Sequence, residues 1–169
     1  MGWMDGRRAK KRYQAGTRAL ARGDYAAAIR DLHEATLYRP DWLEAQHDFG
    51  IALMAAADFG QRNRDPDIHA EHVQELATEA AKAFQTVLKL EPELPEAHNN
   101  RGRALVKLDR LPEAEEEFRI ALRQRSDYAQ AAANLTWLRT QIELLADSNE
   151  EGFDAPLVRE TREYVMQQD

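Results

Sequence analysis

The chain has 169 residues, of which 43% are hydrophobic and 31% charged, a composition that suits one compact domain with a packed core. It contains no cysteine, which excludes disulfides and thiolate metal sites, and its formal net charge of -7 argues against a dedicated nucleic-acid binder. No stretch approaches the ~18 consecutive apolar residues of a membrane-spanning helix, and no basic-then-apolar leader opens the chain, so we expect a cytoplasmic protein.

Residues 1–8 are expected to form an N-terminal tail. The stretch Arg7–Arg12 begins at the end of this tail and has five basic residues among six. Such a run suits contact with an acidic partner or a membrane surface, but a solvated first helical turn is the simpler interpretation.

A set of small and apolar residues is repeated along the chain. Gly16 and Gly50 lie 34 residues apart. A second pattern recurs with constant spacing in three sets: Ala28, Leu32, Ala35 and Pro40; Ala80, Phe84, Val87 and Pro92; Ala114, Phe118, Ala121 and Ser126. Columns that agree in three copies indicate a repeat architecture in which each unit packs on its neighbours.

This pattern resembles the tetratricopeptide repeat, in which a glycine, an Ala-x3-Phe element and a closing proline recur with a period of about 34 residues. The resemblance covers residues 9–146 and implies an all-α, right-handed solenoid in which each repeat is a pair of antiparallel helices. The implied repeats and the capping helix that follows them span residues 9–42, 43–94, 95–128 and 129–146. Small residues let paired helices approach closely, while Leu32, Phe84 and Phe118 fill the space between neighbouring hairpins.

Turn and cap signals support these helices. Asp24 follows Gly23 and suits the N-cap of the second helix. Pro112 suits a first helical turn, whereas Pro40 and Pro92 end the helices that precede them.

The middle repeat is longer than the others. Its first-helix columns follow those of the first repeat by 34 residues, but its second-helix columns follow by 52, so 18 extra residues separate its two helices. They fall within residues 57–75 and predict an extended helical hairpin. Its first helix is expected over Trp42–Asp58, its loop over Phe59–Arg64 and its second helix from Pro66 to Leu90.

The tip of this inserted hairpin would carry three apolar residues, Phe59, Ile68 and Val73, with little of the repeat nearby to cover them. Exposed apolar residues of this kind suggest contact with a second protein. Alternatively, the two arms cover one another or fold back on the protein's own surface, and the sequence favours neither interpretation.

Residues 147–169 are expected to form a polar linker and a short helix. The helix would begin near Pro156 and offers Leu157 and Tyr164 among its apolar side chains. It suits packing on the capping helix or pairing with another chain.

Catalytic and cofactor motifs are missing from the sequence. It has no glycine-rich phosphate loop, Cys-x-x-Cys pair or nucleophile elbow. His69 and His72 share a helical face with Glu75 and Glu79, but a zinc site needs more ligands in a closed geometry. We therefore expect no enzyme, metal site or cofactor, and a metalloprotein built on this histidine pair is the least favoured alternative.

The resemblance implies that the partner-binding surface is the concave groove made by the first helix of each repeat. The implied contact residues are Lys10, Tyr13, Thr17, His47, Ile51, Asn99, Arg103 and Lys107, and the same stripe continues through Leu20, Met54, Val106 and Trp137. We expect Tyr13, His47, Asn99 and Arg103 to be exposed, whereas Leu20, Ile51 and Val106 suit the core between repeats. An extended segment with apolar anchors and an acidic group near Arg103 and Lys107 would fit this stripe.

Family members that bind chaperone tails hold a C-terminal carboxylate with lysine, arginine and asparagine side chains. At the corresponding positions this sequence has Tyr13, Thr17, Asp48, Glu96 and Asn100. The clamp is therefore absent, and binding of chaperone tails is disfavoured.

The leading interpretation is a protein–protein interaction scaffold that binds a partner peptide or helix in the groove, with the inserted hairpin as a second contact. The alternative is a structural protein that self-assembles into a homo-oligomer through the hairpin or the C-terminal helix. The oligomeric state in solution separates these two interpretations.

Overall fold

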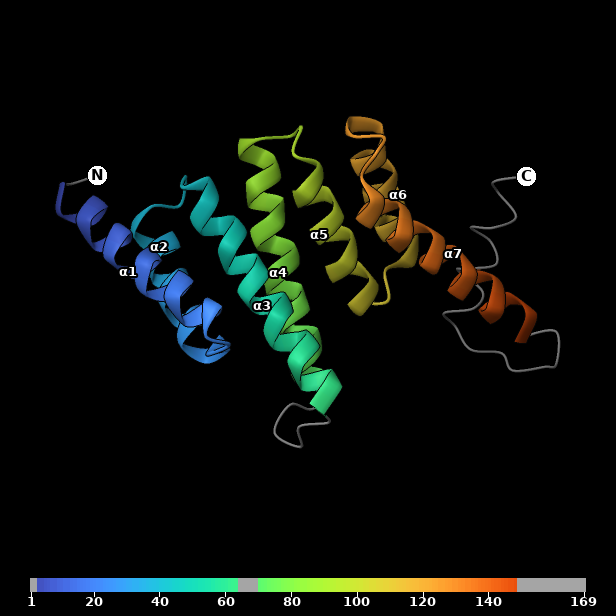
Figure 1. Ribbon diagram of the computed structural model, residues 1–169, viewed down its shortest axis with the longest axis horizontal. Helices are drawn as coiled ribbons and strands as arrows, with labels where there is room; N and C mark the ends of the chain where they lie inside the picture. Colours follow the sequence, from blue (N-terminus) through green and yellow to red (C-terminus); the bar gives the residue numbers. More distant parts are fainter. Residues whose placement is uncertain (1–2, 64–69, 149–169) are drawn as a thin grey trace.

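The computed structural model of the protein describes residues 3–63 and 70–148, and this part of the chain is entirely α-helical (Figure 1). Its helices are α1 (Trp3–Ala21), α2 (Tyr25–Tyr38), α3 (Leu43–Asn63), α4 (Ala70–Leu90), α5 (Pro95–Lys107), α6 (Leu111–Gln124) and α7 (Ala129–Ser148). None of these described helices is both long and apolar enough to cross a bilayer.

The helices pack as antiparallel hairpins in chain order. α1 pairs with α2, α3 with α4 and α5 with α6, and each hairpin then packs on the next through α2–α3, α4–α5 and α6–α7. The odd-numbered helices also touch one another in sequence, from α1 to α3, α5 and α7. They therefore form one continuous side of the molecule.

Glycines set the close approach within each hairpin. A Cβ atom on Gly16 would lie 2.6 Å from the Leu32 side chain, and one on Gly102 would lie 2.6 Å from Phe118. Gly50 meets Phe84 in the same way. Because no side-chain atom fits there, the sequence-based interpretation of these columns as helix-packing glycines is confirmed.

The predicted turn after α1 is confirmed. Gly23 has a φ of 74°, in the left-handed region that glycine adopts without strain. Asp24 then caps α2, because its carboxylate accepts a hydrogen bond of 3.1 Å from the Ala27 N–H. Pro112 stands in the first turn of α6, where its missing N–H costs no helical hydrogen bond.

The core forms two clusters of buried residues. The larger joins α1 to α5 and includes Leu32 and Phe84, which are both fully buried. The smaller joins α5, α6 and α7 around Leu105, Phe118 and Leu138. Each hairpin buries its apolar face only against its neighbours, as expected for a repeat protein.

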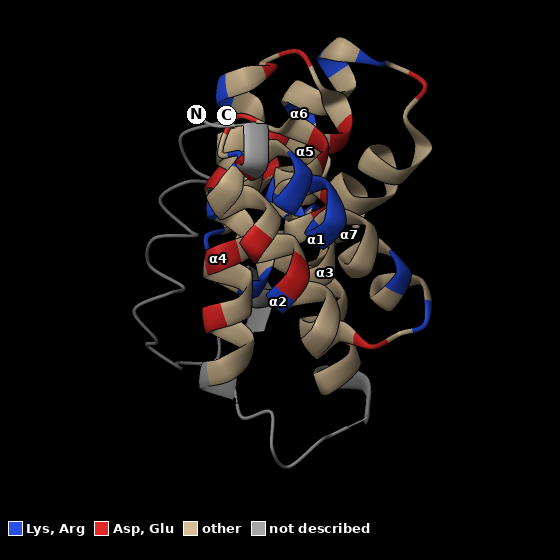
Figure 2. Ribbon diagram, turned by 90° about the vertical axis from the view of Figure 1, so that its left-hand side faces the viewer, with Lys and Arg blue, Asp and Glu red and all other residues tan. Residues whose placement is uncertain are grey.

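Two sequence-based boundaries are corrected. Helix α1 begins at Trp3, so most of the predicted tail is helical, and its Lys and Arg residues lie together on the helix (Figure 2). Helix α3 continues to Asn63 through most of the predicted loop Phe59–Arg64. Gly60, which belongs to the predicted loop, is buried within α3, where packing offsets its low helix propensity.

Other predictions fall on residues outside the described part. These are the proposed N-terminus of the second hairpin helix at Pro66, and the C-terminal linker and helix beyond Ser148. Within the described part, α3 and α4 have 21 residues each, against 13 in α5 and 14 in α6.

Candidate functional site

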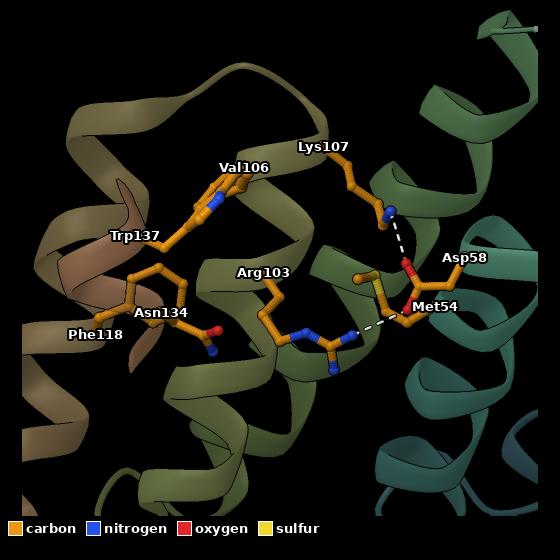
Figure 3. A pocket seen from close by; sticks show the side chains of 8 residues that line it. All are labelled: Met54, Asp58, Arg103, Val106, Lys107, Phe118, Asn134 and Trp137. Atoms are coloured by element: carbon orange, nitrogen blue, oxygen red, sulfur yellow. Dashed lines mark hydrogen bonds and ion pairs between the residues drawn. The ribbon is translucent and has the colours of Figure 1, made fainter. Parts of the chain in front are cut away.

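A pocket of about 170 Å³ opens between α3, α5, α6 and α7 (Figure 3). Its lining residues are Met54, Asp58, Arg103, Val106, Lys107, Phe118, Asn134 and Trp137. Its size suits a single side chain of a larger ligand and not a drug-sized molecule.

One half of the pocket is charged. The Arg103 guanidinium lies 3.0 Å from one oxygen of Asp58, and the Lys107 ammonium lies 2.7 Å from the other (Figure 3). All three side chains are partly buried, with exposed fractions of 31%, 13% and 27% for Arg103, Lys107 and Asp58. Partial removal from water strengthens their attraction relative to a fully exposed pair.

The two cations were predicted from the sequence, but their carboxylate partner was not. Asp58 was placed at the predicted end of its helix, with no signal that it would face α5. Because α3 continues to Asn63 through most of the predicted loop, Asp58 lies within a helix and not at its end.

The other half of the pocket is apolar. Met54 and Phe118 are buried, with exposed fractions of 2% and 1%, and Val106 is partly buried beside them. Trp137 is 52% exposed and belongs to α7. The predicted stripe residues Met54, Val106 and Trp137 thus line one pocket. Phe118 joins them from α6, the second helix of its hairpin.

A pair of asparagines joins α5 to α7 beside the pocket. The Asn134 side chain donates a hydrogen bond of 2.8 Å to the Asn99 side-chain oxygen. Asn99 is fully buried, so the expectation that it is exposed is wrong, because α7 covers it. Its amide nitrogen has no hydrogen-bond partner among the described residues.

At the opposite end of the row of odd-numbered helices, Tyr13 of α1 contacts the second repeat. Its hydroxyl donates a hydrogen bond of 2.8 Å to Asp48, and its ring centroid lies 4.6 Å from that of Trp42. Burial, the hydrogen bond to Asp48 and the negative charges of Asp48 and Glu44 raise the pKa of Tyr13 to about 12. Tyr13 is therefore a half-buried hydrogen-bond donor.

The remaining stripe residues of α1 and α3 differ in exposure. Lys10 is exposed, whereas Thr17 is half-buried and its hydroxyl donates to the Gln14 carbonyl of its own helix. His47 is half-buried, with its ring edge against Phe84. Ile51 packs on the larger core cluster, as the sequence suggested.

The positions of the chaperone-tail clamp are also visible. Asp48 bonds to Tyr13, and Glu96 accepts a hydrogen bond of 2.6 Å from Arg125. Burial opposes the charge of Glu96, but a backbone hydrogen bond and Arg125 outweigh it and hold its pKa below the usual value. Asn100 is buried. Two carboxylates thus stand where the clamp has a lysine and an asparagine.

Two of the three residues expected at the hairpin tip are described. Val73 is buried in the larger cluster, with an exposed fraction of 6%, which favours the alternative in which the protein itself covers the hairpin. Phe59 is 43% exposed, and its ring centroid lies 5.5 Å from that of Tyr25. Ile68 and His69 lie outside the described residues. Among the described residues, no three His, Asp or Glu side chains are placed to hold a metal ion.

Comparison with known proteins agrees with this geometry. Residues 74–129 match the family model of the tetratricopeptide repeat. No curated protein sequence matches the chain.

Solved structures with the same fold include the TPR domain of Arabidopsis OM64, with a TM-score of 0.66 and 16% identity over 80% of this chain and 98% of that one. The first TPR of Spaghetti (RPAP3) bound to the HSP90 peptide SRMEEVD has a TM-score of 0.65 and 16% identity over 82% and 95%. The second TPR domain of human RPAP3 in complex with the HSP70 peptide SGPTIEEVD has a TM-score of 0.63 and 19% identity over 80% and 96%. At these identities the similarity concerns the fold.

Proposed function

Because the chain is a tetratricopeptide-repeat domain protein, we propose that it binds a segment of a partner protein along the side formed by α1, α3, α5 and α7. Tetratricopeptide-repeat domains are protein–protein interaction modules, and their stacked hairpins create extended concave surfaces for this purpose. Binding, and not catalysis, is the activity that this surface supports.

The observation that carries the proposal is the pocket beside Trp137. An indole that is 52% exposed stands over an apolar floor, next to two cations that are partly removed from water. Tryptophan and arginine dominate the energetics of many protein interfaces, because they combine large contact areas with directed polar groups. An apolar side chain of the partner fits the floor, and an acidic one fits the cations.

The proposed contact surface extends from this pocket along the odd-numbered helices. It comprises Lys10, Tyr13, Thr17, His47, Ile51, Arg103, Lys107 and Trp137. Asn99 is buried, so we assign its polar role to Asn134, which bonds to it and lines the pocket.

We further infer that the 18 extra residues of the middle repeat lengthen α3 and α4 within a right-handed solenoid of three hairpins. The lengths of these two helices support this inference. A second contact at the tip of the hairpin rests on Phe59, which keeps a 43% exposed ring.

Self-assembly is the second candidate function. Trp137 and Leu144 on α7 are 52% and 57% exposed, and apolar side chains on the last helix of the described part suit pairing with another copy. Light scattering of the purified chain tests this candidate. A strict monomer at high protein concentration would exclude it.

The binding proposal is tested by affinity capture of partners from native lysate with wild type, Trp137→Ala and Leu37→Ala. Leu37 is the matched control, because it is an apolar side chain on α2 with 65% exposure. We expect Trp137→Ala to capture about tenfold less of a partner protein than wild type does, while Leu37→Ala captures as much as wild type. Loss with Leu37→Ala and retention with Trp137→Ala would place the binding surface elsewhere.

A further inference from the structure

Asp58 occupies a part of α3 that the neighbouring first helices lack. Helix α1 ends at Ala21, five residues after Gly16, and α5 ends at Lys107, five residues after Gly102. Helix α3 instead continues well beyond Gly50, and Asp58 stands eight residues after this glycine. Its carboxylate is therefore brought to α5 by the extension of α3.

The carboxylate is held as a bound anion would be. Each of its two oxygens faces one cation, Arg103 at 3.0 Å and Lys107 at 2.7 Å. These three side chains combine two positive charges with one negative charge. Met54 lies beside them, while Phe118 lines the other side of the pocket, near Asn134 (Figure 3).

We propose that Asp58 is an internal ligand of an anion site formed by Arg103 and Lys107, and that an acidic side chain of the partner binds by displacing it. This inference rests on the proposed function, because the anion site lies within the same pocket. The partner segment is one that carries an aspartate or glutamate next to an apolar residue.

Charge favours an acidic partner over a basic one. A basic side chain would have to approach Asp58 past Arg103 and Lys107, and like charges repel it. An acidic side chain is attracted by both cations. When it replaces Asp58, it takes over the ion pairs with Arg103 and Lys107.

Displacement is feasible because two of the three charged side chains remain partly accessible to solvent. Arg103 and Asp58 retain exposed fractions of 31% and 27%, while Lys107 retains 13%. The attraction within such partly buried pairs is offset in part by lost hydration and side-chain freedom. Asp58 thus acts as a competitor that weakens binding of any single carboxylate and favours segments that also fill the apolar floor.

The test uses two blocked pentapeptides with a central aspartate or a central asparagine between leucines. Each is titrated into wild type, Asp58→Asn and Glu93→Gln, and binding is followed by the NMR signal of the Trp137 indole N–H. Glu93 is the matched control, because it is an exposed carboxylate in the connection between α4 and α5. Thermal unfolding of each variant checks that the near-isosteric substitutions leave the fold intact.

We expect Asp58→Asn to bind the aspartate peptide about three- to tenfold more tightly than wild type, because the competing carboxylate is gone. The asparagine peptide should bind both proteins alike, and Glu93→Gln should match wild type. Unchanged or weaker binding of the aspartate peptide by Asp58→Asn would overturn the inference.

Failure of the inference and failure of the proposed function give different results. If both peptides bind at Trp137 with equal affinity in every variant, the pocket binds peptides but Asp58 is no competitor. If neither peptide shifts the indole signal even in Asp58→Asn, the anion site is overturned. In that case the capture experiment with Trp137→Ala still decides whether this side of the molecule binds a partner.

Discussion

The hydrogen bond from Tyr13 to Asp48 links the first repeat to the second and makes the protein sensitive to alkaline pH. The pKa of Tyr13 is raised from 10.0 to about 12, first by burial and then by Asp48. A raised pKa means that the folded state holds the proton more tightly than the unfolded chain. The stabilisation is complete below pH 10 and is lost as the pH rises from 10 to about 12.

We therefore expect wild type to lose more stability between pH 9 and pH 11 than Tyr13→Phe, by on the order of 1 kcal/mol after allowance for solvent screening. The phenylalanine keeps the ring contact with Trp42 but has no proton to lose. Urea unfolding at both pH values measures the difference, in which the ionisation of all other groups cancels. Equal losses in the two proteins would contradict the prediction.

Side chains fixed by local packing were predictable from the sequence, and those fixed by distant partners were not. Gly50 and Phe84 belong to a repeated pattern, so the close helix approach at the glycine and a large apolar side chain at position 84 followed from the period. The structure adds that Phe84 packs on Gly50 of its own hairpin. Asn99 looked like a groove residue because of its position on a helix face. It is buried because Asn134 on α7 covers it, and the repeat pattern does not predict this contact.

At the scale of helices, the extension of α3 braces the first hairpin. Helices α1 and α5 end five residues after their packing glycines, whereas Phe59 stands nine residues after Gly50 in α3. Its ring centroid lies 5.5 Å from that of Tyr25 at the start of α2. Aromatic pairs of this kind add to the stabilisation from buried area. The extension thus joins the middle hairpin to the first through Phe59 and to the third through Asp58.

We expect Phe59→Ala to lower the free energy of unfolding by about 1–2 kcal/mol, less than for a fully buried phenylalanine because the ring is partly exposed. The matched control is Leu90→Ala at the end of α4, since Leu90 has the same exposed fraction of 43%. Urea denaturation compares the two. An equal loss in both variants would show that the contact with Tyr25 contributes nothing beyond ordinary surface packing.

The two offsets place the extra residues between the helices of the middle repeat, and the sequence predicts a loop over Phe59–Arg64. In the folded protein α3 continues to Asn63, and Gly60 is buried within it. Tertiary packing there outweighs the low helix propensity of glycine, a difference of about 1 kcal/mol. That the extra residues lengthen α3 and α4 stays a proposal, which the lengths of these two helices support.

At the scale of the whole molecule, the fold is shared with domains whose structures hold chaperone peptides, while this chain carries Asp48 and Glu96 where the resemblance places an asparagine and a lysine. The SRMEEVD and SGPTIEEVD complexes have TM-scores of 0.65 and 0.63 with this chain. A shared solenoid fixes the course of the helices but leaves the side chains of the groove free to vary. Ligand preference therefore depends on those side chains.

We expect this chain to bind the peptide SRMEEVD with the same affinity whether its C-terminus is a free carboxylate or an amide. A clamp for the terminal carboxylate needs cations, and Asp48 and Glu96 would instead repel it at their positions. Fluorescence polarisation with both labelled peptides measures the effect, and the first TPR of Spaghetti (RPAP3), whose structure holds SRMEEVD, is the positive control. If the peptide with the free C-terminus bound about tenfold more tightly or better, other cations of this groove would bind the terminal carboxylate. The outcome separates recognition of an internal acidic side chain, which the Asp58 site favours, from recognition of a C-terminal carboxylate.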